Sequence, residues 1–186
     1  MRQNSASWAG TELLKKFREK NNQERLFSYP IPHPSEPSAF CPCSGPFLKA
    51  QWYYLKAAFF QVILQLPYNS LSIWALRSMG AKIGTHVYIS AGVMIDPLLT
   101  DLLTIEDNVL LGSGVKITLH EFQQDRFIAG RVIIRKFAVV GGFSLIGPGI
   151  EIGERASIAG GAVLWRDVPA GKIAIGNPAR IISGEQ

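Results

Sequence analysis

An aliphatic residue recurs at every sixth position between residues 134 and 164 of this chain. The series consists of Ile134, Val140, Ile146, Ile152, Ile158 and Leu164. A helix repeats its buried face about every 3.6 residues and a strand every second residue, so a period of six fits neither. It is typical of a solenoid whose unit is a hexapeptide. The segment is therefore expected to form a stacked array of repeats.

A second row of small or branched residues follows the first at an offset of four positions. Its members are Ala138, Ser144, Ile150, Ala156, Ala162 and Val168. Two inward positions per hexapeptide describe a flat face that turns a corner every six residues. Three such faces close a coil of about eighteen residues, and each coil buries its aliphatic rows by stacking on the next. Glycine often follows the large residue, as expected at a corner where a side chain would crowd the backbone.

The same phase continues upstream in two blocks that are separated by insertions. Their large inward residues are Ile83, Ile89 and Ile95, then Ile105, Leu111 and Ile117. The spacing leaves about four extra residues after the first block and about eleven after the second. Insertions in a solenoid leave from a corner as loops, and such loops commonly carry function. The longer insertion begins at His120.

Composition indicates one globular domain with an appendage. Of the 186 residues, 47% are hydrophobic and 18% are charged, which is too apolar for a disordered chain. The net charge of +5 fits anionic ligands such as phosphates, an acidic membrane surface, or ordinary solubility charge. Residues 1–20 lack the apolar core of a secretory signal, so a cytoplasmic location is expected. Cys41 and Cys43, even with His33, do not match a disulfide framework or a zinc site, and no metal is predicted.

The region before the repeats is expected to contain three segments. Residues 11–20 predict a short basic amphipathic helix, and residues 29–46, with six prolines, an extended linker. Residues 47–66 are strongly apolar but carry two lysines and three glutamines, which argues against a membrane span of roughly 20 apolar residues. Pro67 should end this segment. The predicted organisation is an N-terminal region over residues 1–80 and a repeat domain over residues 81–186.

Two compatible interpretations remain for residues 51–79. They form either a helical cap on the open end of the solenoid or an interfacial helix that lies on a bilayer. The cap is favoured because Trp74, Leu76 and Met79 run directly into the first coil. The second interpretation implies a peripheral membrane contact through residues 47–79.

Three short segments resemble the hexapeptide-repeat acyltransferases. They are GAKIG at 80–84, DVPAG at 167–171 and GNPAR at 176–180. With the repeats, the likeness covers about residues 50 to 182. It is greatest to the sugar O-acetyltransferases of the nodulation, galactoside and maltose type, and to capsule and colanic acid acetyltransferases with a similar apolar lead-in. The resemblance implies an all-β, left-handed parallel β-helix with an N-terminal helical cap, which assembles as a homotrimer with active sites between subunits.

The resemblance also implies acetyl-coenzyme A as donor and His120 as the catalytic base. A sugar hydroxyl keeps its proton at neutral pH, so its attack on a thioester needs a base, and neutral histidine suits that role. His120 lies on the outer side of a coil at the foot of the loop 121–130, where the family has its catalytic histidine. A second group should orient the ring, and the candidates are Asp96, Glu121, Asp125 or a backbone carbonyl.

The donor is expected to lie in a groove along the later coils. By resemblance, two glycines flank the thioester and supply a backbone N–H to the oxyanion. The pantetheine arm follows, and cationic and aromatic side chains meet the adenosine and phosphate end. From thioester to phosphates, the implied residues are Gly141 and Gly142, then Gly160, Gly161 and Ala162, and finally Trp165, Arg166 and Arg180.

The predicted function is acetyl transfer from acetyl-coenzyme A to a saccharide hydroxyl, with a surface polysaccharide or a sugar intermediate as acceptor and no nucleic acid as partner. Val139 and Gly114 stand where the family often has tryptophan and an acceptor-contacting asparagine, which leaves the acceptor open. Acetylation of a sugar amine, a small amine or a xenobiotic is one alternative, and a non-catalytic trimeric scaffold is another. A zinc hydratase on the same solenoid would need a third histidine beside His86 and His120.

Overall fold

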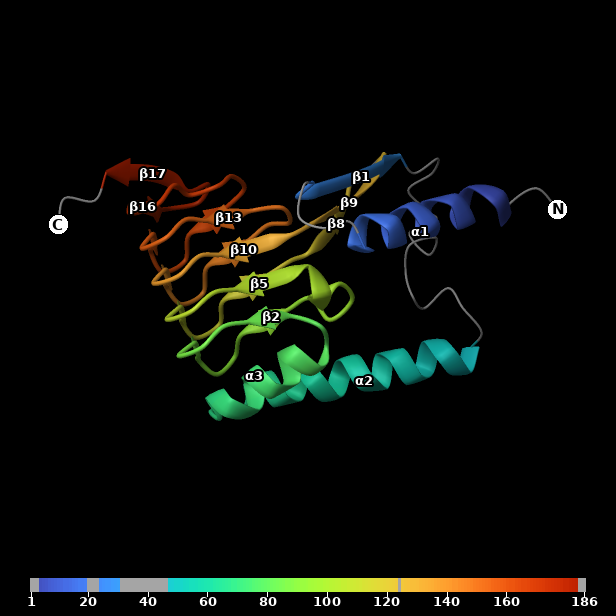
Figure 1. Cartoon of the computed structure of the whole chain (residues 1–186), viewed down its shortest axis with the longest axis horizontal. Helices are drawn as coiled ribbons and strands as arrows, with labels where there is room; N and C mark the ends of the chain where they lie inside the picture. Colours follow the sequence, from blue (N-terminus) through green and yellow to red (C-terminus); the bar gives the residue numbers. More distant parts are fainter. Residues whose placement is uncertain (1–3, 20–23, 31–46, 124, 184–186) are drawn as a thin grey trace.

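Short parallel strands stack into three sheets that form the three faces of a prism (Figure 1). The structure, a computed structural model, describes residues 4–19, 24–30, 47–123 and 125–183. Successive strands of one coil belong to different faces, and each strand pairs with its counterpart in the next coil. Each face is therefore built from segments far apart in the sequence, as expected of a solenoid.

Each face has its own set of strands. The first face consists of β2 (Lys82–Ile83), β5 (Leu103–Ile105), β10 (Val132–Ile134) and β13 (Glu151–Ile152). The second consists of β3 (Tyr88–Ile89), β6 (Leu110–Leu111), β11 (Val139–Val140), β14 (Ser157–Ile158), β16 (Lys172–Ile175) and β17 (Arg180–Ser183). The third consists of β4 (Met94–Ile95), β7 (Lys116–Ile117), β12 (Leu145–Ile146) and β15 (Val163–Leu164). All these neighbours are parallel except β16 and β17, which pair antiparallel.

The aliphatic rows predicted from the hexapeptide period fill the interior of the prism. Every member of the row from Ile134 to Leu164 is at most 2% exposed, and the offset row from Ala138 to Val168 is buried as well. Inward residues are ladder partners, so that one column on the first face runs through Ile83, Ile105, Ile134 and Ile152. Burial of an aliphatic side chain contributes about 1.5–3 kcal/mol, so these columns are a main source of stability.

Both predicted insertions leave the solenoid where the spacing indicates. Paired inward residues of the third face lie 22, then 29 and then 18 residues apart along the chain. The shorter insertion contains a 3-10 turn at Thr100–Leu102. The longer one folds as a hairpin of β8 (His120–Phe122) and β9 (Arg126–Gly130).

A strand from the N-terminal region joins this hairpin. β1 (Leu26–Pro30) pairs antiparallel with β9, and the resulting sheet has the order β1-β9-β8. The prediction of an irregular linker over residues 29–46 is therefore wrong at its start, because Tyr29 and Pro30 belong to β1. Pro30 is tolerated because it ends an edge strand. The rest of that linker, with His33, Cys41 and Cys43, lies outside the described residues.

Helix α1 (Asn4–Glu19) packs on β1 and is longer than the helix predicted for residues 11–20. Leu14 and Phe17 are buried as the amphipathic pattern predicts, whereas Leu13 is exposed. The rings of Phe17 and Phe27 lie 5.5 Å apart, and Arg131 donates a hydrogen bond of 2.7 Å to the Phe17 carbonyl oxygen. Helix α1 is thus tied to β1 and to the residue that follows β9.

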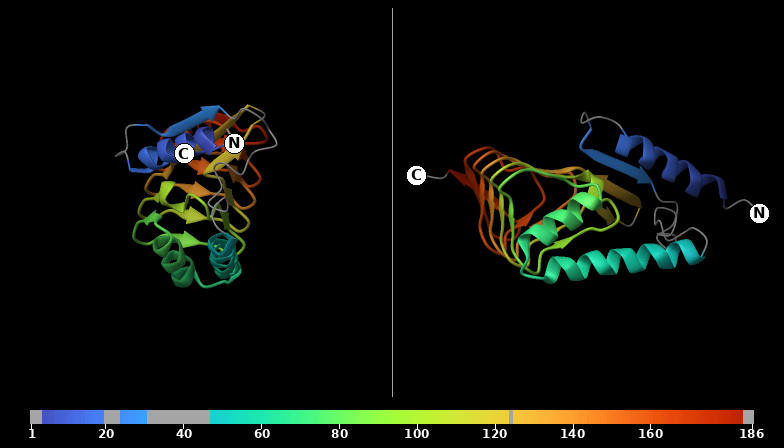
Figure 2. Two further views of the ribbon diagram at one scale, coloured as in Figure 1. Left: turned by 90° about the vertical axis from the view of Figure 1, so that its right-hand side faces the viewer. Right: turned by 60° about the horizontal axis from the view of Figure 1, so that its bottom comes forward.

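Helices α2 (Phe47–Gln65) and α3 (Asn69–Ser78) lie at the end of the prism formed by the first coil (Figure 2). Pro67 lies between them, as predicted. Asn69 donates to the Val87 carbonyl oxygen at 2.9 Å and accepts from the Ile89 N–H at 2.8 Å, which fixes α3 to the first coil. Leu76 is buried there, but Trp74 remains half-exposed. Within the described ranges, the helices are too short or too polar to cross a bilayer.

Candidate active site

His120 and Asp96 meet at one corner of the prism. Asp96 directly follows β4, and His120 begins β8 shortly after β7, so the pairing of β4 with β7 stacks the two residues. The Nδ1 atom of His120 contacts the Oδ2 atom of Asp96. Asp96 is nearly buried, with 7% of its side chain exposed, whereas 22% of the His120 side chain is exposed. The carboxylate therefore lies behind the ring, and the ring faces solvent.

The Asp96 carboxylate is itself fixed by backbone donors. Its Oδ1 accepts from the Leu98 N–H at 2.9 Å, and its Oδ2 accepts from the Leu119 N–H at 3.3 Å. A carboxylate on Nδ1 favours the tautomer in which Nδ1 carries the proton and Nε2 is the basic nitrogen. Of the other orienting candidates, Glu121 bonds to Gln123 and Asp125 bonds to Arg126.

Two phenylalanines hold the imidazole from the hairpin side. The centroids of Phe122 and Phe127 lie 5.7 Å and 5.6 Å from that of His120, and Phe127 is fully buried. Cross-strand pairing of His120 with Ala129, and of Phe122 with Phe127, produces this cluster. The ring is thereby restricted on one side by packing and on another by Asp96.

A pocket of about 240 Å³ opens beside this pair. Its remaining walls come from α2 and from the outward side of the first two coils. They are formed by Gln61, Met94, Ile95, Pro97, Lys116, Ile117 and Thr118. Gln61 is not among the site residues predicted from the sequence, because there it counts only as one of the polar residues of an apolar segment. A polar side chain flanked by apolar residues on both sides is the only sequence signal for its position in a pocket.

The four glycines expected at the thioester and pantetheine lie together on another edge of the prism. Gly142 accepts from the Gly161 N–H at 2.9 Å, and a Cβ on Gly141 would lie 2.5 Å from the Gly160 nitrogen. However, the Gly141 N–H donates to the Ile158 carbonyl oxygen at 2.8 Å, because the residue continues the ladder of β11. This N–H is therefore already engaged, and the oxyanion role expected of Gly141 stays a prediction. Among the described residues, the Gly142 N–H has no such ladder bond.

The other residues expected to contact the donor differ in accessibility. Ala162 is fully buried, so its methyl group belongs to the core and only its backbone could meet a ligand. Trp165 is exposed and lies beside Gly147, where a Cβ would come within 2.9 Å of its ring. Arg166 and Arg180 are exposed. These residues do not border the pocket at His120 in the described chain. Trp165 and Arg166 follow β15 as Thr118 follows β7, so they lie on the same edge as His120 but two coils further along. The third face separates His120 from the glycines, which follow strands of the second face.

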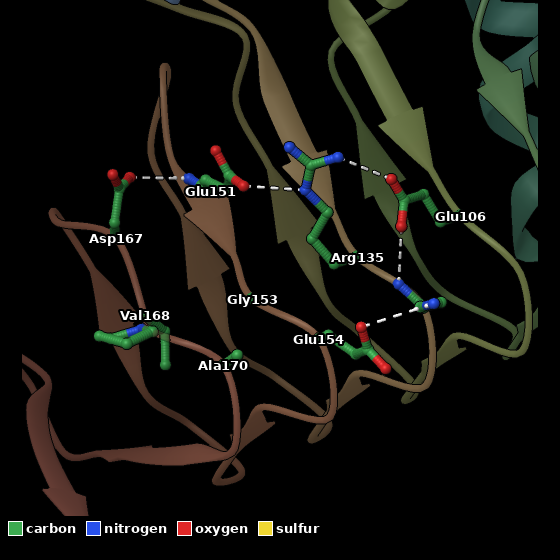
Figure 3. A pocket seen from close by; sticks show the side chains of 10 residues that line it. Glu106, Arg135, Glu151, Gly153, Glu154, Asp167, Val168 and Ala170 are labelled. Carbon is green, nitrogen blue, oxygen red and sulfur yellow. Dashed lines mark hydrogen bonds and ion pairs between the residues drawn. The ribbon is translucent and has the colours of Figure 1, made fainter.

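The first face carries a network of ion pairs. Arg135 bonds to Glu106 and Glu151 at 2.8 Å each, and Arg25 bonds to Asp167 at 2.6 Å. These residues, apart from Arg25, line a cavity of about 550 Å³ (Figure 3). Burial raises the pKa of Asp167, but hydrogen bonds from Arg25 and from the Glu151 N–H lower it by more, so that the net pKa lies below its ordinary value. The paired charges indicate a stabilising ladder across successive coils.

The described part of the chain contains no group of three or more histidine, cysteine, aspartate or glutamate side chains arranged to hold a metal ion. His86 is exposed in the first coil, far along the sequence from His120 and on a different corner.

Comparisons with known proteins identify similar chains. No protein-family model matches the sequence. YvoF of Bacillus subtilis, which is named as an acetyltransferase, is 28% identical over 138 residues, covering 74% of this chain and 78% of YvoF. A dTDP-3-amino-3,6-dideoxy-alpha-D-galactopyranose 3-N-acetyltransferase from Aneurinibacillus thermoaerophilus is 48% identical over 52 residues, covering 28% of this chain and 27% of that enzyme.

A solved structure supports the fold. The hexapeptide-repeat acetyltransferase VCA0836 from Vibrio cholerae, in complex with acetyl-coenzyme A, superposes with a TM-score of 0.62 at 20% identity. The match covers 76% of this chain and 92% of VCA0836. The fold is the left-handed parallel β-helix that the hexapeptide period and the family resemblance predict.

Proposed function

This chain is related in sequence and in fold to the hexapeptide-repeat acetyltransferases, and we propose that it transfers the acetyl group of acetyl-coenzyme A to a hydroxyl of a saccharide. The observation that carries this proposal is the contact between Asp96 and Nδ1 of His120 beside an open pocket. In a neutral imidazole whose Nδ1 proton is held by a carboxylate, Nε2 is the basic nitrogen and points away from that carboxylate. That arrangement is the one required of a general base.

His120 acts in both halves of the reaction. Its Nε2 takes the proton of the acceptor hydroxyl while that oxygen attacks the thioester carbonyl carbon. Asp96 stabilises the imidazolium that forms and does not take the proton itself. The C–S bond then breaks, and the imidazolium returns its proton to the departing thiolate. The products are an acetyl ester and free coenzyme A, so His120 ends in its starting state.

The edge of the prism that carries Gly141, Gly142, Gly160 and Gly161, here called the glycine edge, fits the donor. A Cβ on Gly161 would meet no atom within 4 Å, so the backbone there borders open space in which a pantetheine arm could lie. Gly142 is our candidate for the oxyanion donor, since its N–H is not part of the ladder among described residues. Trp165, Arg166 and Arg180 are assigned to the adenosine and phosphate end, where exposed cations and an aromatic surface are available.

The complete site is assigned to a homotrimer. His120 and the glycine edge lie on opposite sides of the third face, so a neighbouring copy is needed to bring the base to the donor. The second face supports such packing because its outward row is apolar and exposed at Tyr88, Leu110 and Val139. The first face, with its ion pairs, is assigned to solvent.

Helix α2 is assigned to the surface of an anionic bilayer. Trp52, Leu55, Phe59 and Val62 follow helical spacing and are 58–71% exposed. No acidic residue occurs between Glu36 and Asp96, so anionic headgroups would meet no repulsion from this region. Large exposed apolar and aromatic side chains on one side of a helix favour interfacial binding. This contact would bring the pocket close to acceptors that are made at the membrane.

Acetylation of a sugar amine is the second candidate, favoured by the matched segment of the sugar 3-N-acetyltransferase. Release of free thiol from acetyl-coenzyme A, measured against a panel of sugars and amino sugars, tests both candidates. His120→Ala should lower turnover by at least about a hundredfold while the protein stays folded. Unchanged turnover in this variant would remove His120 from the mechanism. Failure of the wild-type protein to bind acetyl-coenzyme A would instead indicate a non-catalytic scaffold.

A further inference from the structure

Gln61 occupies a fixed position on the wall of the pocket at His120. Helix α2 is anchored by the buried side chains of Phe60, Ile63 and Leu64. The Leu64 carbonyl oxygen also accepts from the Gly92 N–H of the first coil at 3.1 Å. These contacts orient the helix so that Gln61 lines the same pocket as Asp96 and His120.

The Gln61 carboxamide has an unsatisfied donor. Its Nε2 atom is buried and makes no hydrogen bond with any described residue. Buried polar groups in native proteins are nearly always paired, so an unpaired one needs an explanation. Because this one borders a pocket, a ligand oxygen that enters the pocket would provide the missing acceptor.

The other polar groups of the pocket are already engaged or lie at its edge. Asp96 holds His120 and two backbone N–H groups. Thr118 donates to the Ile146 carbonyl oxygen at 3.2 Å. Lys116 is exposed. The amide of Gln61 is therefore the interior donor that remains for a bound molecule.

We propose that Gln61 is an acceptor-binding residue of this enzyme, an inference that rests on the proposed function. When His120 Nε2 receives the proton of the reacting hydroxyl, the Gln61 amide donates to a second oxygen of the same acceptor. A carboxamide both donates and accepts, which matches a sugar hydroxyl. The ligand class that follows is a polyhydroxylated acceptor with two neighbouring oxygens. The resembled family often has an acceptor-contacting asparagine at the position of Gly114. In this chain the corresponding amide would come from Gln61 on α2.

The test compares Gln61→Leu and Gln61→Glu with the wild-type protein. The probes are acetyl-coenzyme A and p-nitrophenyl glycosides, including amino-sugar glycosides, with thiol release as the assay. Both substitutions remove the donor, so each should raise KM for the glycoside about tenfold, the size of one lost hydrogen bond. KM for acetyl-coenzyme A should not change. Gln65→Leu, on an exposed position one turn later, is the matched control and should behave as wild type.

Each outcome decides between the two proposals. Active wild-type protein with an unchanged glycoside KM in both Gln61 variants would overturn the role of Gln61 and leave the proposed function intact. Wild-type protein that acetylates none of the glycosides would overturn both. Circular dichroism and gel filtration of the variants exclude unfolding as the cause of a raised KM.

Discussion

Asp96 contacts Nδ1 of His120 across two successive coils, although the two residues are 24 positions apart in the sequence. Asp96→Asn retains the size of the side chain but removes its charge, and its amide nitrogen favours the opposite tautomer of the imidazole. We expect kcat to fall by at least about a hundredfold, with KM for acetyl-coenzyme A unchanged. Steady-state kinetics at pH 7 measure this effect.

Glu121→Gln provides the matched control for Asp96→Asn. The Glu121 carboxylate bonds to Gln123 and not to the ring, so its loss should change kcat by less than about twofold. Equal losses in the two variants would show that general charge near the hairpin, and not the contact at Nδ1, sustains activity.

The hexapeptide period was sufficient to predict the prism, because it specifies which two residues of each repeat face the core. The stacking of Ile95 on Ile117 follows from that period, so the proximity of Asp96 to His120 was implied by it. The sequence left several partners open for His120 because Glu121 and Asp125 are also near in the chain. In the folded chain their carboxylates bond to Gln123 and Arg126 instead.

Other features have no local signal. The pairing of β1 with β9 joins segments about a hundred residues apart, and the alternation in β1 does not specify a partner. The engagement of the Gly141 N–H in the ladder has no local signal either. The resemblance identified the corner, but the hydrogen bond to Ile158 depends on where the ladder of β11 ends. The role proposed for Gln61 depends on how α2 packs against the first coil, which the local sequence does not specify.

The ion pair between Arg25 and Asp167 predicts acid sensitivity. The pKa of Asp167 is lower in the folded protein than its ordinary value of 3.8. Its contribution to stability is therefore present above the unfolded pKa and is lost as the pH falls through the folded pKa. Thermal melts between pH 7 and pH 3 should show a smaller loss of Tm in Asp167→Asn than in wild type. Asp125→Asn, at an exposed pair within the hairpin, should follow the wild-type profile.

The outward row of the second face predicts which surface holds the proposed trimer together. Val139→Glu introduces a charge at the end of the apolar row, next to Leu110. A buried, unpaired carboxylate at an interface is costly, so the variant should be a folded monomer. Light scattering measures its mass, and circular dichroism its fold. We expect turnover to be lost with the trimer. A monomer with full activity would show that one chain contains the whole site.

The exposed stripe of α2 predicts binding to anionic vesicles. Wild-type protein should sediment with vesicles that contain phosphatidylglycerol and much less with vesicles of phosphatidylcholine alone. Trp52→Ser with Phe59→Ser removes two large side chains from the stripe and should reduce the bound fraction severalfold. The double variant should remain trimeric and keep its turnover on a soluble acceptor. Dissociation of the trimer in this variant, without any vesicle binding by the wild type, would assign the stripe to a neighbouring subunit and not to lipid.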